Sequence, residues 1–269
     1  EDILKGNSKY GVQMNKDGVS EWSGTNSPER WLEKHGWLKV HHDEIYAVLG
    51  NCDEPEFIEE LEDAGINAER VLNYTDGIAI QAIKMVFKYL PKCYENGEND
   101  PEAREKMHNA STLAGMAFAN AFLGMNHSMA HKVGGEFHVP HGRTNAILLP
   151  HIIRYNGQVP TKLNIWPKVE NYKADIKYME LAKLIGLDPK TPAEGVEMFA
   201  QACEKLIAAV GILNNFKSQG IEEQDWMDRV HRMAMNAYED QCSPANPRMP
   251  MVKDMEKILV DVYWGPNGK

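Results

Sequence analysis

Residues 109 to 156, NASTLAGMAFANAFLGMNHSMAHKVGGEFHVPHGRTNAILLPHIIRYN, decide the fold and hold five of the ten histidines. Apolar residues in the first half of this stretch recur at helical spacing. His127 and His131 are four residues apart, so both imidazoles project from about the same face of the expected helix. This spacing is typical of a metal clamp or a proton relay.

A second histidine-bearing helix is expected after a break in the chain. Gly134 and Gly135 predict the break, and Pro140 followed by His141 predicts the first residues of the next apolar helix. Such a break lets the chain fold back on itself. We therefore expect His141 to approach the first histidine pair, so that three imidazoles converge.

The composition fits a folded protein of one large or two modest domains. The chain has 269 residues, of which 43% are hydrophobic, and a formal net charge of -10. This acidic balance argues against nucleic-acid binding, which needs clustered Lys and Arg. Apolar runs are too short for a membrane span and the first ten residues carry no signal pattern, so a cytoplasmic protein is expected. Reduced thiols are predicted for the four scattered cysteines, Cys52, Cys93, Cys203 and Cys242.

Residues 1–70 differ in pattern from the rest and predict a small α+β module of unknown family. The segments KYGVQM, NKDG and VSEW predict a two-stranded hairpin. Ser27 and Asp53 predict the starts of two helices, each followed by residues that suit a first helical turn. Residues 71–269 predict a second, mostly α domain.

The pattern of residues 71–269 predicts a bundle of seven or eight helices. The first of these helices is expected to begin near Tyr74. Asp100 as cap and Pro101 at the first position predict the start of the next, which is expected to run on into the helix of the first histidine pair. Residues 157–172 predict a loop or hairpin-like insert. Four further helices are expected at ADIKYMELAKLIG, PAEGVEMFAQACEKLIAAVG, EEQDWMDRVHRMAMNAYED and VKDMEKILVDVYWG.

The pattern G-x-x-H-x-x-x-H followed by P-H-G-x-x-N-A-x-L-L-P, from Gly124 to Pro150, resembles the metal-site signature of the iron-dependent (group III) alcohol dehydrogenases. The segments YTDGIAIQAIKMVFKYLPKCYENG, DPEAREKMHNASTLAGMAFANAFLG and EDQCSPANPRMP extend the likeness from Tyr74 to Gly265. This region is similar to the C-terminal half of the alcohol dehydrogenase part of bifunctional aldehyde/alcohol dehydrogenases. The resemblance implies the dehydroquinate synthase-like helical bundle of that family.

The resemblance also implies a metal site, with Fe2+ or Zn2+ bound by His127 and His141. It places His131 near the metal, in contact with substrate or cofactor, and makes His131 the catalytic candidate. The family's other two ligands are an Asp and a His four residues apart on an earlier helix. No Asp-x-x-x-His occurs in this sequence, so half of the family's ligand set is missing.

Three residues of the N-terminal module offer the missing ligand types. His41, His42 and Asp43 are candidate substitutes if that module folds over the bundle, because a His and a carboxylate would restore the ligand chemistry. The alternative interpretation places them on an exposed strand.

The resemblance implies interconversion of small alcohols and aldehydes with NAD. The sequence contains neither a Gly-Gly-Gly-Ser phosphate loop nor a G-x-G-x-x-G motif, so impaired or absent activity is expected. The alternative is a non-catalytic binding or assembly module, which forms a homo-oligomer or associates with a related full-length dehydrogenase, since this family assembles partly through this domain. A third interpretation is a fusion of two segments near Asn73.

Overall fold

The computed structural model describes residues 12–14, 20–22, 74–160 and 172–266. Strands β1 (Val12–Met14) and β2 (Ser20–Trp22) pair antiparallel, with Val12 opposite Trp22, at the place where the sequence predicts a hairpin. The chain divides into a unit that contains this hairpin and a second unit that contains the helices. The predicted N-terminal helices, the candidate ligands at 41–43 and the predicted domain boundary lie outside the described residues.

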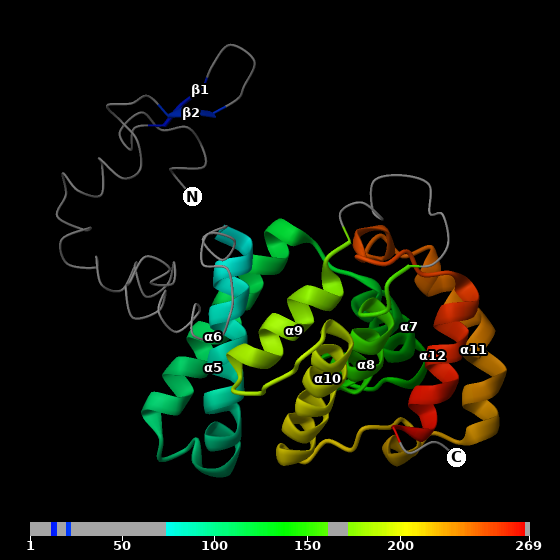
Figure 1. Cartoon of the computed structure of the whole chain (residues 1–269). Coiled ribbons are helices and arrows are strands. Elements are labelled where there is room, and N and C mark those ends of the chain that lie inside the picture. The colour runs from blue at the N-terminus through cyan, green and yellow to red at the C-terminus, as the bar shows by residue number, and fades with distance from the viewer. Residues whose placement is uncertain (1–11, 15–19, 23–73, 161–171, 267–269) are drawn as a thin grey trace. The chain divides into compact units, whose positions relative to one another are not determined.

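Eight α-helices form the described part of the second unit, in agreement with the predicted bundle (Figure 1). They are α5 (Tyr74–Asn96), α6 (Pro101–Ala121), α7 (Met125–Phe137), α8 (His141–Asn156), α9 (Ala174–Leu184), α10 (Pro192–Ala209), α11 (Glu223–Tyr238) and α12 (Val252–Trp264). Two short 3-10 turns, η2 (Lys217–Gln219) and η3 (Ser243–Ala245), lie between the later helices. None of the described helices is both long enough and apolar enough to cross a membrane.

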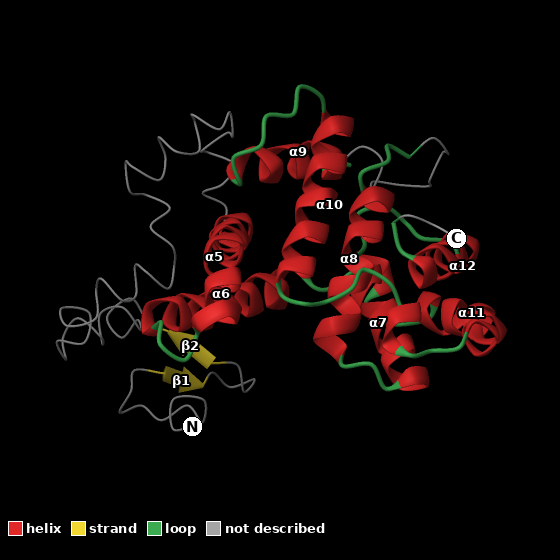
Figure 2. Ribbon diagram, turned by 90° about the horizontal axis from the view of Figure 1, so that it is seen from below, coloured by secondary structure: helices red, strands yellow, loops and turns green. Residues whose placement is uncertain are grey.

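Helix α8 occupies the middle of the bundle. It packs against α7, α9, α10 and α12, while α5 and α6 form a hairpin on one side and α11 and α12 form a pair on the other (Figure 2). The central position explains why α8 has a buried face of aliphatic residues, because helices meet it from several directions. Helix α7 lies between α8 and α11, so both histidine-bearing helices are held by packing on more than one side.

The start of α6 follows the sequence prediction. The Asp100 carboxylate accepts a hydrogen bond of 2.8 Å from the Ala103 amide, and Pro101 occupies the first helical position. A capping carboxylate also interacts favourably with the positive end of the helix dipole.

The predicted continuity between α6 and α7 is wrong. Helix α6 ends at Ala121, where Phe122 takes a positive φ of 64°, and α7 begins only at Met125. A non-glycine residue in this conformation cannot continue a right-handed helix. The histidine pair is therefore carried by a separate helix of 13 residues.

The break predicted at Gly134 and Gly135 is also wrong in position. Both glycines lie inside α7, and the turn comes at His138, which has a left-handed φ of 55°. Glycine costs a helix only about 1 kcal/mol, which packing against two neighbouring helices outweighs. Pro140 determines the turn instead, because a proline disfavours helical geometry in the residue before it.

Trp226 of α11 lies at the centre of the main hydrophobic core and is fully buried. Its ring stacks on Phe216 and Phe137, with centroids 4.8 and 5.2 Å away, and packs against Tyr263. Its indole N–H donates to the Leu259 carbonyl at 2.9 Å. One side chain thus ties α11 to α7 and α12, which fixes the helix that carries the first two histidines.

Candidate metal centre

The structure brings together the three imidazoles that the sequence singles out. His127 and His131 lie on α7, and His141 is the first residue of α8. The ring centroids of His127 and His141 are 5.4 Å apart, those of His131 and His141 are 5.3 Å apart, and those of His127 and His131 are 6.3 Å apart. The chain folds back at residues 138–140, whereas the sequence predicts the break at Gly134 and Gly135.

The surroundings of His127 favour its neutral form. Burial lowers the pKa of its imidazole, and the neighbouring His141 and His131 lower it further. Its ring also lies near Phe118 of α6, with centroids 6.5 Å apart. A neutral imidazole offers the nitrogen lone pair that a metal ion requires, so the surroundings of His127 favour a ligand role.

His141 is oriented by an asparagine one helical turn later. The Asn145 side-chain amide lies 3.0 Å from His141 Nε2 and donates to the His141 carbonyl at 3.1 Å. Asn126 of α7 in turn donates to Asn145 Oδ1 at 2.9 Å. This pair of asparagines links α7 to α8 and limits rotation of the His141 ring. Because an amide nitrogen only donates, His141 Nε2 accepts from Asn145, and Nδ1 is the ring nitrogen left to bind a metal once its proton is lost.

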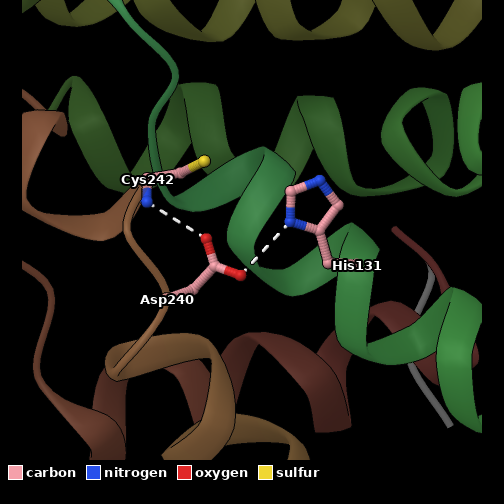
Figure 3. A group of neighbouring side chains, drawn as sticks. All are labelled: His131, Asp240 and Cys242. Carbon is pink, nitrogen blue, oxygen red and sulfur yellow. Dashed lines mark hydrogen bonds and ion pairs between the residues drawn. The ribbon is translucent and has the colours of Figure 1, made fainter.

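His131 is oriented by a carboxylate from another part of the chain. Its Nδ1 lies 3.2 Å from Asp240 Oδ2, and the Cys242 amide donates to Asp240 Oδ1 at 3.0 Å (Figure 3). Asp240 Oδ2 also accepts from the Lys132 ammonium at 2.8 Å. Burial opposes ionisation of Asp240, but these hydrogen bonds together hold the pKa of its carboxyl well below the usual range. The carboxylate therefore accepts from Nδ1, which leaves His131 Nε2 with a lone pair.

Asn246 fixes the start of α7, the helix of the first two histidines. Its Oδ1 accepts from the Met125 amide at 3.2 Å, and its amide donates to Asn156 Oδ1 at 2.7 Å and to the Arg248 carbonyl at 2.6 Å. A Cβ at Gly124 would lie 2.7 Å from Asn246 Oδ1, so the close approach requires glycine there. The segment after α11 thus sets both the position of α7 and the orientation of His131.

The donor set fits a transition metal but is incomplete in the described part of the chain. Imidazole nitrogens suit both iron and zinc. Among the described residues, the one group of three close metal-type ligands is His131, Asp240 and Cys242, and it includes neither His127 nor His141. No described carboxylate therefore completes a site with these two histidines.

Asp240 and Cys242 are site residues that the sequence reasoning missed. They lie within the segment EDQCSPANPRMP, which carries part of the family resemblance, yet more than a hundred residues separate them from His131. No local spacing indicates that contact. Two other described histidines have other roles: His138 caps α7, and exposed His231 pairs with Glu256.

The fold and the site define a class: an all-helical domain with a histidine centre built where two helices meet. The model of the Fe-containing alcohol dehydrogenase family, C-terminal, matches residues 60–263, so the chain belongs to that family. The likeness seen from Tyr74 onward is thereby confirmed.

Relatives of known sequence agree with the family. The chain is 64% identical over 191 residues to aldehyde-alcohol dehydrogenase 2 of Entamoeba histolytica, and 42% identical over 196 residues to the bifunctional aldehyde-alcohol dehydrogenase AdhE of Escherichia coli K12. Each match covers 71% of this chain and 22% of the relative. Thus the chain spans about a fifth of the length of these relatives.

Solved structures show the same fold. The alcohol dehydrogenase from Oenococcus oeni has a TM-score of 0.60 and 34% identity, over 70% of this chain and 45% of its own. A 1,3-propanediol oxidoreductase has a TM-score of 0.59 and 33% identity, over 70% of this chain and 44% of its own.

Proposed function

We propose that this chain supplies the metal-binding half of an iron-dependent alcohol dehydrogenase. In this proposal His127 and His141 bind Fe2+ or Zn2+, and His131 lies beside the metal in contact with substrate or cofactor. The observation that carries the proposal is the convergence of the three imidazoles, with ring centroids 5.3 to 6.3 Å apart. The substrates are small alcohols and aldehydes, and NAD is the hydride carrier.

The bound metal would polarise the alcohol or aldehyde oxygen as a Lewis acid while a nicotinamide exchanges a hydride with the adjacent carbon. The residues of this chain have supporting roles. Asn145 holds the His141 ring, and Asp240 holds His131 so that its Nε2 faces the reacting groups as a hydrogen-bond acceptor. Burial lowers the pKa of His127, which favours the neutral imidazole that binds a metal.

Two imidazoles are fewer than the three or four protein ligands that normally hold such an ion. We therefore propose weak metal binding and impaired turnover unless other residues complete the site. His41, His42 and Asp43 are the candidates within this sequence. A distance beyond about 10 Å from these residues to the His127 and His141 pair excludes them, since ligand bonds are near 2 Å.

Metal analysis combined with NAD(H)-dependent turnover of ethanol or acetaldehyde tests this proposal. We expect iron uptake that falls at least tenfold in His127→Ala and in His141→Ala, because each substitution removes a ligand. His231→Ala is the matched control, since this histidine is exposed and lies outside the group. Uptake that is unchanged in both ligand variants would contradict the metal role, and wild-type-like turnover in His131→Ala would contradict its catalytic role.

A second candidate function is an assembly module. Phe118 and Phe122, at the end of α6, are 48% and 49% exposed, although Phe118 lies beside His127. Exposed aromatic side chains next to a polar site favour coverage by another domain or chain. Light scattering of the purified chain, alone and mixed with a full-length aldehyde-alcohol dehydrogenase, tests this function. A monomer that remains separate from the dehydrogenase would contradict it.

A further inference from the structure

We propose a second metal site, made of His131 Nδ1, Asp240 Oδ2 and Cys242 Sγ, that binds Zn2+ or another divalent ion with affinity for sulfur. The three atoms lie within 4.8 Å of one another, and the side chains come from α7 and from the turn after α11 (Figure 3). This site shares His131 and Asp240 with the surroundings of the proposed His127 and His141 centre, but neither His127 nor His141 is one of its ligands.

The spacing of the three atoms suits a tetrahedral ion. Zinc bonds of about 2.0 to 2.3 Å place neighbouring ligand atoms roughly 3.3 to 3.8 Å apart. His131 Nδ1 and Asp240 Oδ2 are already 3.2 Å apart, and the Cys242 sulfur lies within 4.8 Å of both, so the thiol has to move closer to complete three ligands. The His131 side chain is 37% exposed, which gives water access to the fourth position.

The donor types select the ion. A thiolate, an imidazole and a carboxylate match zinc, whereas magnesium and calcium prefer oxygen ligands alone. On binding, the Cys242 thiol proton leaves to solvent and the Nδ1 proton of His131 moves to Nε2 through water, so Nε2 then donates and His131 cannot act as the acceptor proposed for the other centre. The thiolate and the Asp240 carboxylate then balance the two positive charges of the ion.

The surroundings already contain the outer hydrogen bonds that such a site uses. Asp240 is 9% exposed, and its Oδ1 accepts from the Cys242 backbone amide. The Lys132 ammonium donates to Oδ2, the proposed ligand oxygen, and has to move aside when the ion binds. These donors fix the carboxylate in place and limit its conformations before any ion binds. Cys242 is 1% exposed, so its sulfur is held inside the turn rather than free in solvent. The site is therefore preorganised on two packed elements.

Cobalt substitution tests the site, because Co2+ bound to a thiolate gives an intense near-ultraviolet charge-transfer band that nitrogen and oxygen ligands do not give. We expect one equivalent of Co2+ to produce this band in the whole chain, and excess Zn2+ to abolish it. Cys242→Ser should remove the band and weaken zinc binding at least about tenfold. Circular dichroism and thermal melts establish that this variant is folded.

Matched variants separate this site from the other centre. Cys203→Ser and Cys93→Ser remove thiols elsewhere and should keep the band, as should His127→Ala. Asp240→Asn supplies a second test, with a weaker band expected. Absence of the band in the wild type, its persistence in Cys242→Ser or its loss in His127→Ala would overturn the proposal. Failure of the His127 and His141 centre leaves the expected band unchanged.

Discussion

Asn246 connects the segment after α11 to the helix of the histidine pair, and its truncation should be costly. The side chain is 1% exposed and makes hydrogen bonds to the Met125 amide, Asn156 Oδ1 and the Arg248 carbonyl. Asn246→Ala leaves these three groups without their partner. Each buried group that loses its hydrogen bond costs roughly 1–3 kcal/mol. Water that enters the vacated space offsets part of the combined cost of the three groups. We therefore expect the free energy of unfolding to fall by about 3 kcal/mol.

Urea unfolding followed by tryptophan fluorescence measures this loss, because Trp226 is buried in the same core. The matched control is Asn120→Ala, since the Asn120 amide donates to the Met116 carbonyl on an exposed face of α6. We expect that substitution to change the free energy of unfolding by less than about 1 kcal/mol. A loss below about 1 kcal/mol for Asn246→Ala as well would refute the role assigned to Asn246.

Three further predictions concern the bundle. Trp226→Ala should lower the free energy of unfolding by about 3–5 kcal/mol in urea, because it removes a buried aromatic ring, and a loss below about 2 kcal/mol would count against its central position. Asp100→Ala should cost about 1 kcal/mol by the same measurement, and no loss would mean that the cap is not formed in solution. Arg154 donates a hydrogen bond to Glu197, which lowers the pKa of the Glu197 carboxyl from its ordinary value of 4.5. The pair therefore stabilises the fold fully above pH 4.5, and this stabilisation is lost as the pH falls through the lowered pKa. The difference in unfolding free energy between the wild type and Arg154→Met should therefore narrow in acid, whereas a constant difference down to about pH 2 would contradict the pairing.

The parts of the fold that follow local rules were predictable. Asp100 and Pro101 indicate a helix start by residue type alone, and Pro140, the N-cap residue of α8, indicates a start because proline is favoured at helix N-termini. The helical spacing of His127 and His131 likewise holds in α7. These signals need no knowledge of distant residues.

The errors arise where packing between helices outweighs local preference. Gly134 and Gly135 stay helical because α7 is held on two sides, while Phe122 takes a conformation that its residue type does not predict. The contact between His131 and Asp240 joins residues that are 109 positions apart, so only the fold reveals it. Long-range contacts of this kind leave no spacing pattern in one sequence.

The most direct test of the central claim is X-ray diffraction from crystals grown with Fe2+ or Zn2+, using anomalous scattering at the edge of that metal. The account predicts an anomalous peak about 2.0 to 2.2 Å from a ring nitrogen of both His127 and His141. A well-ordered histidine group with no peak between these two rings would contradict the assignment of His127 and His141 as metal ligands.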